Sequence, residues 1–182
     1  MDDQRLVFSH TAEGLFVRGL KADQHPALKA RLKALGLDLD GKLRPAYTYA
    51  EWCTFLDAAT QELFPGVPKT QALFTIGEQL IDGYFSTMVG KALLGLVKIM
   101  GPKRTLARMK QNFRTGNSYS ESTLTEHGPG HYTLWLNETD DYRPVTQGLL
   151  QRGLMVTGAK GLEVKIARFD EKGTDFEVRW TP

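Results

Sequence analysis

The sequence predicts an α+β protein in which N-terminal helices and a long central helical segment pack on an antiparallel sheet in the C-terminal part. In the first two thirds of the chain apolar residues recur at helical spacing, whereas beyond residue 117 apolar and polar residues alternate. The 182 residues are enough to bury one substantial core, and 41% of them are hydrophobic. Because no linker rich in Pro, Gly and Ser divides the chain, residues 1–182 are expected to form a single α+β domain.

The N-terminal third is predicted to be mainly helical. The segments expected there are a short strand at residues 5–8, a strand or a short helix at 13–20, and helices at 26–35 and 49–64. Pro26 stands early in the first of the two helices and Gly36 follows its end, an asymmetry that is typical of helix ends. Pro65 and Gly66 end the second helix.

A central segment, residues 73–117, is expected to be the buried helical element around which the rest is organised. Its apolar residues fall in adjacent pairs that recur every four residues, at Leu80/Ile81, Tyr84/Phe85, Met88/Val89, Ala92/Leu93 and Leu96/Val97. Since four residues advance a helix by about 400°, this stripe rotates by roughly 40° at each pair. The segment therefore either runs through the middle of the domain or breaks and changes direction, and Gly83, Gly90 and Gly95 permit both.

A new helix is expected after Gly101, because Pro102 suits a first helical turn. The basic residues of this helix are Lys103, Arg104, Arg108, Lys110 and Arg114. The cluster is interpreted either as a site for phosphate or acidic lipid headgroups or as a solvated helix face, and we favour the solvated face. With 23 basic and 21 acidic residues, the chain has too little excess charge to favour a nucleic-acid partner.

Beyond residue 117 the pattern predicts the order β-β-α-β-β. The expected elements are strands at 118–126 and 131–137, a helix at 145–156, and strands at 162–169 and 174–180. Pro144 stands near the start of the helix and Gly158 near its end. Gly148 and Gly153 weaken this helix and suggest that it packs closely on the sheet.

The sequence offers little catalytic or metal-binding chemistry. His127 and His131 flank the first hairpin turn, but no third ligand with suitable spacing accompanies them. The single cysteine, Cys53, is expected to be buried and inert, and it fits a reducing compartment. Asp140 and Asp141 are better explained as a helix cap than as an acid–base pair. Because motifs for nucleophilic catalysis and Gly-rich phosphate binding are missing from the sequence, we expect no enzyme, no cofactor and no metal site.

Targeting and membrane signals are missing from the sequence too. The N-terminal stretch MDDQRLVFSH is too acidic and has too few apolar residues for a signal peptide. A membrane-spanning helix would need about 18 consecutive apolar residues, and no such run occurs. These observations lead us to expect a cytoplasmic protein without a transmembrane segment.

Three stretches of the chain carry a resemblance to a known family. They are EGLFVRGL near the start, GYFSTMVGKALLGLVKIMGPKRTLARMKQNFRTGN in the centre, and GLEVKIARFDEKGTDFEVRW at the end. Together they resemble a myxobacterial paralogous family of uncharacterised proteins, over nearly the whole chain. The residues that carry the match are Thr87, Gly90, Leu93, Gly101, Arg104, Phe113, Arg114 and Asn117. This resemblance implies no activity and no catalytic residue.

More remotely, helices followed by two hairpins around a helix resemble an architecture shared by four-vinyl-reductase-type domains, vesicle-tethering TRAPP subunits and haem nitric-oxide-binding domains. That resemblance implies a hydrophobic cavity between the central segment and the sheet, suited to a small organic molecule, an acyl chain or haem. The haem-binding relatives place a histidine on a helix lining the cavity. Because residues 73–117 contain no histidine, haem is not expected here.

Function is therefore expected to be non-enzymatic, as a binding or sensory module for an apolar or lipid-like small molecule. The residues predicted to contact the ligand are Tyr84, Met88, Arg114, Tyr119 and Trp135. Arg114 and Tyr119 are expected at the mouth of the cavity, where helix gives way to strand, and for the aromatic residues plain core packing is the alternative. The alternative function is a scaffold that acts by self-association as a homodimer or by binding a protein partner.

Overall fold

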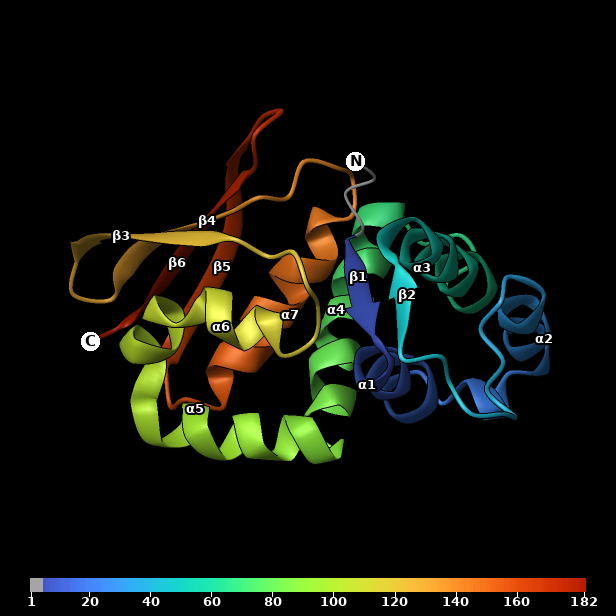
Figure 1. The fold of residues 1–182 in the computed structure, drawn as a ribbon. Coiled ribbons are helices and arrows are strands. Elements are labelled where there is room, and N and C mark those ends of the chain that lie inside the picture. Colours follow the sequence, from blue (N-terminus) through green and yellow to red (C-terminus); the bar gives the residue numbers. More distant parts are fainter. Residues whose placement is uncertain (1–4) are drawn as a thin grey trace.

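The computed structural model describes residues 5–182, so residues 1–4 of the acidic N-terminal stretch lie outside the described part (Figure 1). Its elements in chain order are β1 (Leu6–Phe8), α1 (Ser9–Ala12), the π-helix η1 (Glu13–Gly19), the 3-10 helix η2 (Ala22–Gln24), α2 (Pro26–Ala34), β2 (Ala46–Thr48), α3 (Tyr49–Leu63), α4 (Lys69–Tyr84), α5 (Met88–Ala107), α6 (Met109–Arg114), β3 (Ser122–Gly128), β4 (His131–Leu136), α7 (Arg143–Met155), β5 (Lys160–Phe169) and β6 (Thr174–Thr181). The α+β fold class and the order β-β-α-β-β are confirmed.

The N-terminal third contains the two predicted helices, α2 and α3, with ends within one residue of those expected. The segment at 13–20, for which strand and helix were both open, is helical. The short strand β2, which the sequence did not predict, pairs antiparallel with β1. Helix α3 begins with a capping box, in which Thr48 Oγ1 accepts from the Glu51 amide and the Glu51 carboxylate accepts from the Thr48 amide.

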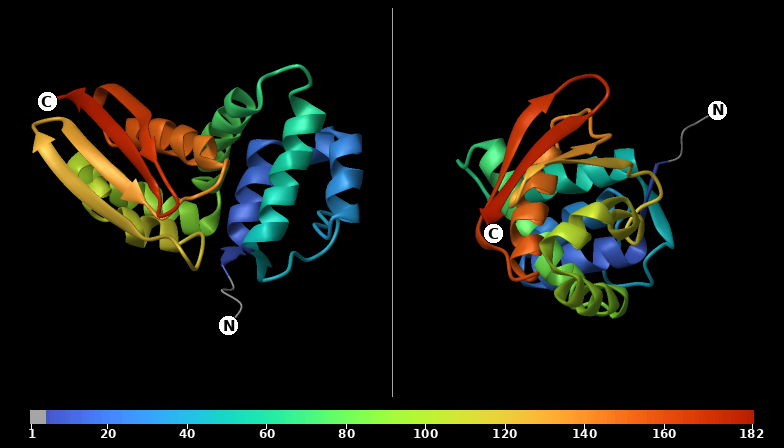
Figure 2. Two further views of the ribbon diagram at one scale, coloured as in Figure 1. Left: turned by 90° about the horizontal axis from the view of Figure 1, so that it is seen from above. Right: turned by 90° about the vertical axis from the view of Figure 1, so that its left-hand side faces the viewer.

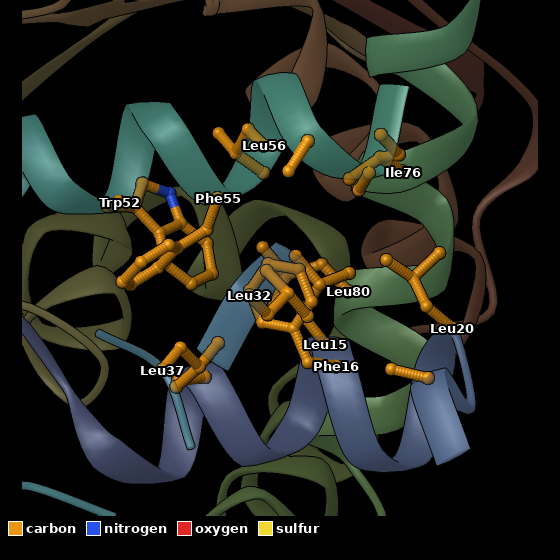
Figure 3. Packing of buried hydrophobic residues seen from close by; sticks show 14 of the residues in the cluster. Leu15, Phe16, Leu20, Leu32, Leu37, Trp52, Phe55, Leu56, Ile76 and Leu80 are labelled. Atoms are coloured by element: carbon orange, nitrogen blue, oxygen red, sulfur yellow. The ribbon is translucent and has the colours of Figure 1, made fainter. Parts of the chain in front are cut away.

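A first hydrophobic core lies between η1, α2, α3 and α4, as Figure 3 shows. Leu15, Phe16, Leu32 and Phe55 are completely buried in it. The Phe16 ring packs edge-on against the Phe55 ring, with centroids 6.2 Å apart. The helical content of this third therefore comes from amphipathic helices that share one well-packed interior.

The central segment changes direction, which was one of the two outcomes expected from its rotating stripe. Helices α4 and α5 are joined by a short break and bent by 96°. Thr87 caps the new helix by accepting a hydrogen bond from the Gly90 amide at 3.0 Å. Gly101, with φ of +73°, interrupts α5 just before Pro102, so the expected restart of the helix is confirmed.

Burial of the whole central segment was expected, and for α5 this prediction is wrong. Helix α4 is largely buried, whereas α5 exposes 87% of Met88, 43% of Leu96 and 86% of Ile99. The reason is geometric, because the bend moves α5 away from the first core and leaves its outer face without a covering element (Figure 1). Only the inner face of α5, including Val97 and Leu106, is buried.

No single helix of residues 5–182 is long and apolar enough to cross a membrane. The bent pair α4–α5 reaches the necessary length and hydropathy only when the two helices are taken together.

The C-terminal sheet has the antiparallel order β3-β4-β6-β5, and Figure 2 shows it on the side opposite the N-terminal helices. Residues Tyr132, Leu134 and Leu136 of β4 point to a second hydrophobic core, which α6 and α7 complete. The α6 contribution is Met109, which is nearly fully buried. The molecule thus has one core among the N-terminal helices and another under the sheet.

Helix α7 lies between the two cores, and its glycines face α4 instead of the sheet, contrary to the prediction. A Cβ at Gly148 would overlap the carbonyl oxygen of Phe74, and a Cβ at Gly77 would overlap that of Val145. The two helix backbones therefore touch at paired glycines. Glutamines provide the contact with the sheet instead, since Gln151 donates to the Leu162 carbonyl at 3.0 Å.

Three of the five basic residues after Gly101 pair with acidic residues in or just before β3. Lys103 pairs with Glu126 at 2.8 Å, and Lys110 pairs with Glu121 at 2.6 Å. Arg114 also pairs with Glu121. Arg104 and Arg108 are exposed, so the cluster fits a solvated face on which three of the five charges are locally paired.

Candidate functional site

A cavity lies where the two cores meet, and it offers about 140 Å³ to the centres of water-sized molecules. Its walls are mainly apolar and come from five helices: Trp52 and Leu56 of α3, Leu80 and Ile81 of α4, Leu93 and Val97 of α5, Met109 and Phe113 of α6, and Leu149, Leu150 and Leu154 of α7. Such a concave apolar site with a few polar groups is typical of small-molecule pockets. The bend between α4 and α5 creates it, because α5 is held away from the first core.

The polar end of the cavity is built by tyrosines and carboxylates from distant parts of the chain. Tyr49 at the start of α3 donates its hydroxyl to Asp140 Oδ2 at 2.7 Å. The other oxygen of Asp140 accepts from the Tyr142 amide at 3.0 Å. Desolvation by burial raises the pKa of Tyr49 and the pKa of Tyr119 far above their ordinary values. Both phenols therefore stay neutral, and that of Tyr49 acts as a hydrogen-bond donor.

Glu138 stands out at this end because one of its carboxylate oxygens has no partner. Its Oε1 accepts from the Thr146 hydroxyl, whereas Oε2 is buried without a hydrogen bond from any residue in 5–182. Burial is the largest effect on this group and raises the pKa of Glu138 to about 8, with the Asp140 carboxylate adding to the rise. Thr146 and, more weakly, Arg143 act in the opposite direction.

A second unsatisfied atom belongs to the same cavity. Thr105 Oγ1 on α5 is buried and also lacks a partner within residues 5–182. Buried polar groups are nearly always hydrogen-bonded, and leaving one unpaired costs about 1–3 kcal/mol. Both unsatisfied side-chain atoms found in the described chain thus belong to residues that line a single, mainly apolar cavity.

Charged groups around the cavity are few and mostly acidic. Within the described chain, the charged residues of the lining are Arg5, Glu138 and Asp140. The Arg5 guanidinium lies 4.2 Å from the centre of the Tyr49 ring and 5.8 Å from that of Tyr119. The lining therefore has an excess of negative charge when both carboxyl groups are ionised.

Two of the five residues predicted to contact a ligand lie in the cavity lining. They are Tyr84, whose hydroxyl is 2.8 Å from Thr115 Oγ1, and Tyr119, whose ring packs edge-on against Tyr49. Both phenols sit on the first-core side of the cavity.

The other three predicted residues lie outside the lining. Met88 is almost fully exposed at the start of α5. Arg114 donates its Nε to the Ser120 carbonyl at 2.9 Å and pairs with Glu121. Trp135 falls between the inward-pointing residues of β4 and therefore lies on the opposite face of the sheet.

The most distinctive residue, Glu138, was missed by the sequence analysis. It stands in the acidic stretch Asn137–Glu138–Thr139–Asp140–Asp141, which has the composition of a solvated turn. The prediction that Asp140 and Asp141 cap a helix is wrong, because α7 has Tyr142 at its N-cap position and no side-chain cap. Asp140 instead accepts from the Tyr142 amide with one oxygen and from the Tyr49 hydroxyl with the other. No spacing or motif distinguishes Glu138 from its exposed neighbours.

Haem, one of the ligands implied by the remote resemblance, does not fit these residues. No histidine belongs to the part of the lining that residues 5–182 form, and the nearby His10 directs its Nε2 to the Thr115 carbonyl. No cluster of three His, Cys, Asp or Glu side chains suited to a metal occurs in the described chain. The raised pKa values of the lining tyrosines disfavour a tyrosinate ligand, and the carboxyl groups would repel the propionates of haem.

Cys53 is less buried than the sequence analysis expected, but its thiol is unreactive. The thiol is half-buried, and burial, reinforced by Asp140, raises the pKa of Cys53 to about 12. It is therefore a poor nucleophile at neutral pH.

The fold closely resembles that of H-NOX domains. An oxygen-binding H-NOX domain related to soluble guanylate cyclases, solved as its oxygen complex, is 12% identical over 96% of each chain, with a TM-score of 0.72. An H-NOX protein from S. oneidensis is 11% identical over 96% of each chain, with a TM-score of 0.69. An unliganded Fe(II) H-NOX protein from K. algicida is 14% identical over 95% of each chain, with a TM-score of 0.64.

These matches confirm the remote architectural resemblance to haem nitric-oxide-binding domains, while the resemblance to four-vinyl-reductase domains and TRAPP subunits stays a prediction. No functionally curated protein matches the sequence. The myxobacterial origin assigned to the family from the sequence also stays a prediction. A family model described as "Protein of unknown function (DUF2378)" matches residues 5–181, and the protein therefore belongs to that family.

Proposed function

We propose that the protein is a non-enzymatic sensory module that binds a small, mainly apolar molecule in the cavity between its two cores. The observation that carries this proposal is the pair of unsatisfied buried atoms, Thr105 Oγ1 and Glu138 Oε2, in a cavity with otherwise apolar walls. A ligand with an apolar body and a polar group would satisfy both the walls and the orphaned atoms. The architecture supports the proposal, since one similar structure is an H-NOX domain that binds oxygen.

The apolar walls supply a modest affinity by themselves. Burying a chain of about six methylene groups gains about 5 kcal/mol, at about 0.8 kcal/mol for each group. Loss of translational and rotational freedom on binding offsets much of this gain. Tight and selective binding therefore depends on the polar end of the cavity.

Helix α5 is the element that we propose transmits binding. It contributes Leu93, Val97 and Thr105 to the cavity, while its outer face is exposed. The part of α5 from Met88 to the kink at Gly101 carries Leu93 and Val97, and it is flanked by the break before Met88 and by that kink, two places where it can pivot. A ligand that fills the cavity would press on α5 and shift it relative to α4.

Native mass spectrometry of the full chain purified from cells tests the proposal. We expect a co-purifying small molecule, and we expect raised melting temperatures with some members of a lipophile library. A clean ligand-free mass together with no thermal shift across the library would contradict the proposal.

A scaffold function is the second candidate, and the exposed face of α5 favours it. Met88, Leu96 and Ile99 are large apolar residues that share that face. Self-association through α5 predicts a dimer in light scattering that the double substitution Met88→Gln, Ile99→Gln converts to a monomer. A strict monomer for the unsubstituted protein would contradict the homodimer.

A further inference from the structure

The geometry around Glu138 indicates which polar group the ligand carries. Glu138 follows the end of β4, and its side chain is held from one side only, by the hydroxyl of Thr146 on α7. The second oxygen, Oε2, is buried at the cavity with no donor from residues 5–182. The carboxyl group is therefore fixed in orientation and has one free coordination side.

A second carboxylate, that of Asp140, lines the same end of the cavity. Neither Glu138 nor Asp140 forms an ion pair with a basic residue of the described chain; their partners are Thr146, Tyr49 and the Tyr142 amide. Two acidic groups at the end of an apolar cavity are neutralised either by a proton, as burial favours for Glu138, or by a cation that binds between them.

The basic residues near these carboxylates are engaged elsewhere. The Arg143 guanidinium lies 3.9 Å from the centre of the Phe169 ring and 3.4 Å from Asp141, which points to solvent. The Arg5 guanidinium is stacked on Tyr49. The residues around the site thus leave room for a positive charge contributed by a ligand.

We infer that the cavity selects an amphiphilic amine, whose protonated amino group binds between Glu138 and Asp140 while its alkyl part lies along α5 and α7. This inference rests on the proposed function and adds the chemical class of the ligand. An ammonium group supplies three donors, which suits two carboxylates with acceptor sites still open. An alcohol supplies one donor, and a carboxylate ligand would be repelled by both residues.

Three compounds of equal chain length, octylamine, 1-octanol and octanoate, test the inference on the full chain by isothermal titration calorimetry at about pH 8. We expect octylamine to bind at least about tenfold more tightly than 1-octanol, because its hydrogen bonds are charge-assisted, and octanoate to bind most weakly.

Substitutions at the polar end make the test specific. Glu138→Gln keeps the shape of the side chain, and we expect it to weaken octylamine binding about tenfold while changing 1-octanol binding less than about twofold. Asp140→Asn is the second variant and should weaken octylamine binding in the same direction. Glu171→Gln, at an exposed glutamate in the turn between β5 and β6, is the matched control and should change neither affinity.

The two possible failures are distinguishable. If 1-octanol binds as tightly as octylamine, or if Glu138→Gln and Asp140→Asn leave octylamine binding unchanged, the inference about the amine is overturned while binding in the cavity stands. If none of the three compounds binds to protein whose circular dichroism shows a folded state, the proposed apolar-ligand function is overturned as well.

Discussion

Helices α4 and α5 are neighbours in the chain and carry the same apolar pattern, yet they have opposite places in the structure. Helix α4 is clamped by close backbone contacts on two sides, at Gly83 against η1 and at Gly77 against α7. Helix α5 exposes Met88 and Ile99, and its Gly95 has open space around it. The difference shows that the same apolar pattern has two uses here. In α4 it buries the helix between its neighbours, and in α5 it places apolar residues on the side of the helix that lines the cavity.

The largest effect on the free energy of unfolding is expected when one methyl group is added to α4, and the same addition to α5 is the comparison. Gly77→Ala puts a Cβ onto the Val145 carbonyl, so we expect it to lower the free energy of unfolding by about 3 kcal/mol or more. Gly95→Ala meets nothing, and we expect it to raise the free energy of unfolding by about 0.5–1 kcal/mol through helix propensity. Urea unfolding of both variants measures the contrast, which equal effects of the two substitutions would refute.

The next largest effect concerns how the free energy of unfolding depends on pH through Glu138. Because burial raises the pKa of Glu138 to about 8, the folded protein holds a proton between about pH 4.5 and pH 8 that the unfolded chain releases. The free energy of unfolding should therefore fall as pH rises through this window. Glu138→Gln removes the effect, and we expect it to stabilise the protein by about 2 kcal/mol near pH 8 and by almost nothing near pH 4.5.

Chemical unfolding of both proteins across this pH range provides the measurement. The value of about 2 kcal/mol allows for the partial solvent exposure of the residue at the cavity end. A constant difference between the two proteins at all pH values would show that Glu138 does not titrate in the folded state as described.

Ligand binding should depend on the same proton. The groups that face Glu138 are Asp140, Arg143 and Thr146, and the neighbouring phenol of Tyr119 has its pKa raised by burial, so it stays neutral. Octylamine needs the ionised carboxylate, so its affinity should rise up to about tenfold per pH unit below about pH 8 and level off above it. Calorimetry at several pH values measures this, and the affinity of 1-octanol should lack the dependence. Parallel pH profiles for the two compounds would contradict proton-linked recognition of the amine.

The smallest effect is expected on the outer face of α5. Ile99→Gln should change the free energy of unfolding by less than about 0.5 kcal/mol, because the side chain is almost fully exposed. Leu106→Ala, on the buried face of the same helix, should cost about 2–4 kcal/mol. Thermal unfolding at two protein concentrations separates a fold effect from self-association. A large loss for Ile99→Gln that grows with concentration would show that this face is covered by a second copy.

Sequence periodicity was sufficient for the architecture of the C-terminal part. In the strand predicted at 131–137, Tyr132, Leu134 and Leu136 alternate with Thr133 and Trp135, and the structure buries the first three in β4. The same alternation places Trp135 outside the core, so its distance from the cavity was implicit in the pattern. Periodicity did not reveal that α5 is uncovered, because burial of a helix depends on which elements pack against it and not on its own residues.

The candidate site was harder to predict for a different reason. Tyr84 was proposed from the central segment and Tyr119 from the junction of helix and strand, and both line the cavity. Glu138 could not be found in this way, since an acidic residue in an acidic loop is usually solvated. Glu138 is unusual because Thr146 of α7 holds one of its oxygens while the other is buried without a partner in residues 5–182. Both features depend on the tertiary structure.

Hydrogen exchange of the full chain with and without octylamine at about pH 8 tests the central claim most directly, because it reports the two helices separately. We predict slower exchange on binding in residues 88–114 and 137–146, and unchanged exchange in α4, which is already locked between η1 and α7. Unchanged exchange in residues 88–114, or protection spread evenly over the chain, would contradict the assignment of α5 as the movable wall of a ligand-binding cavity.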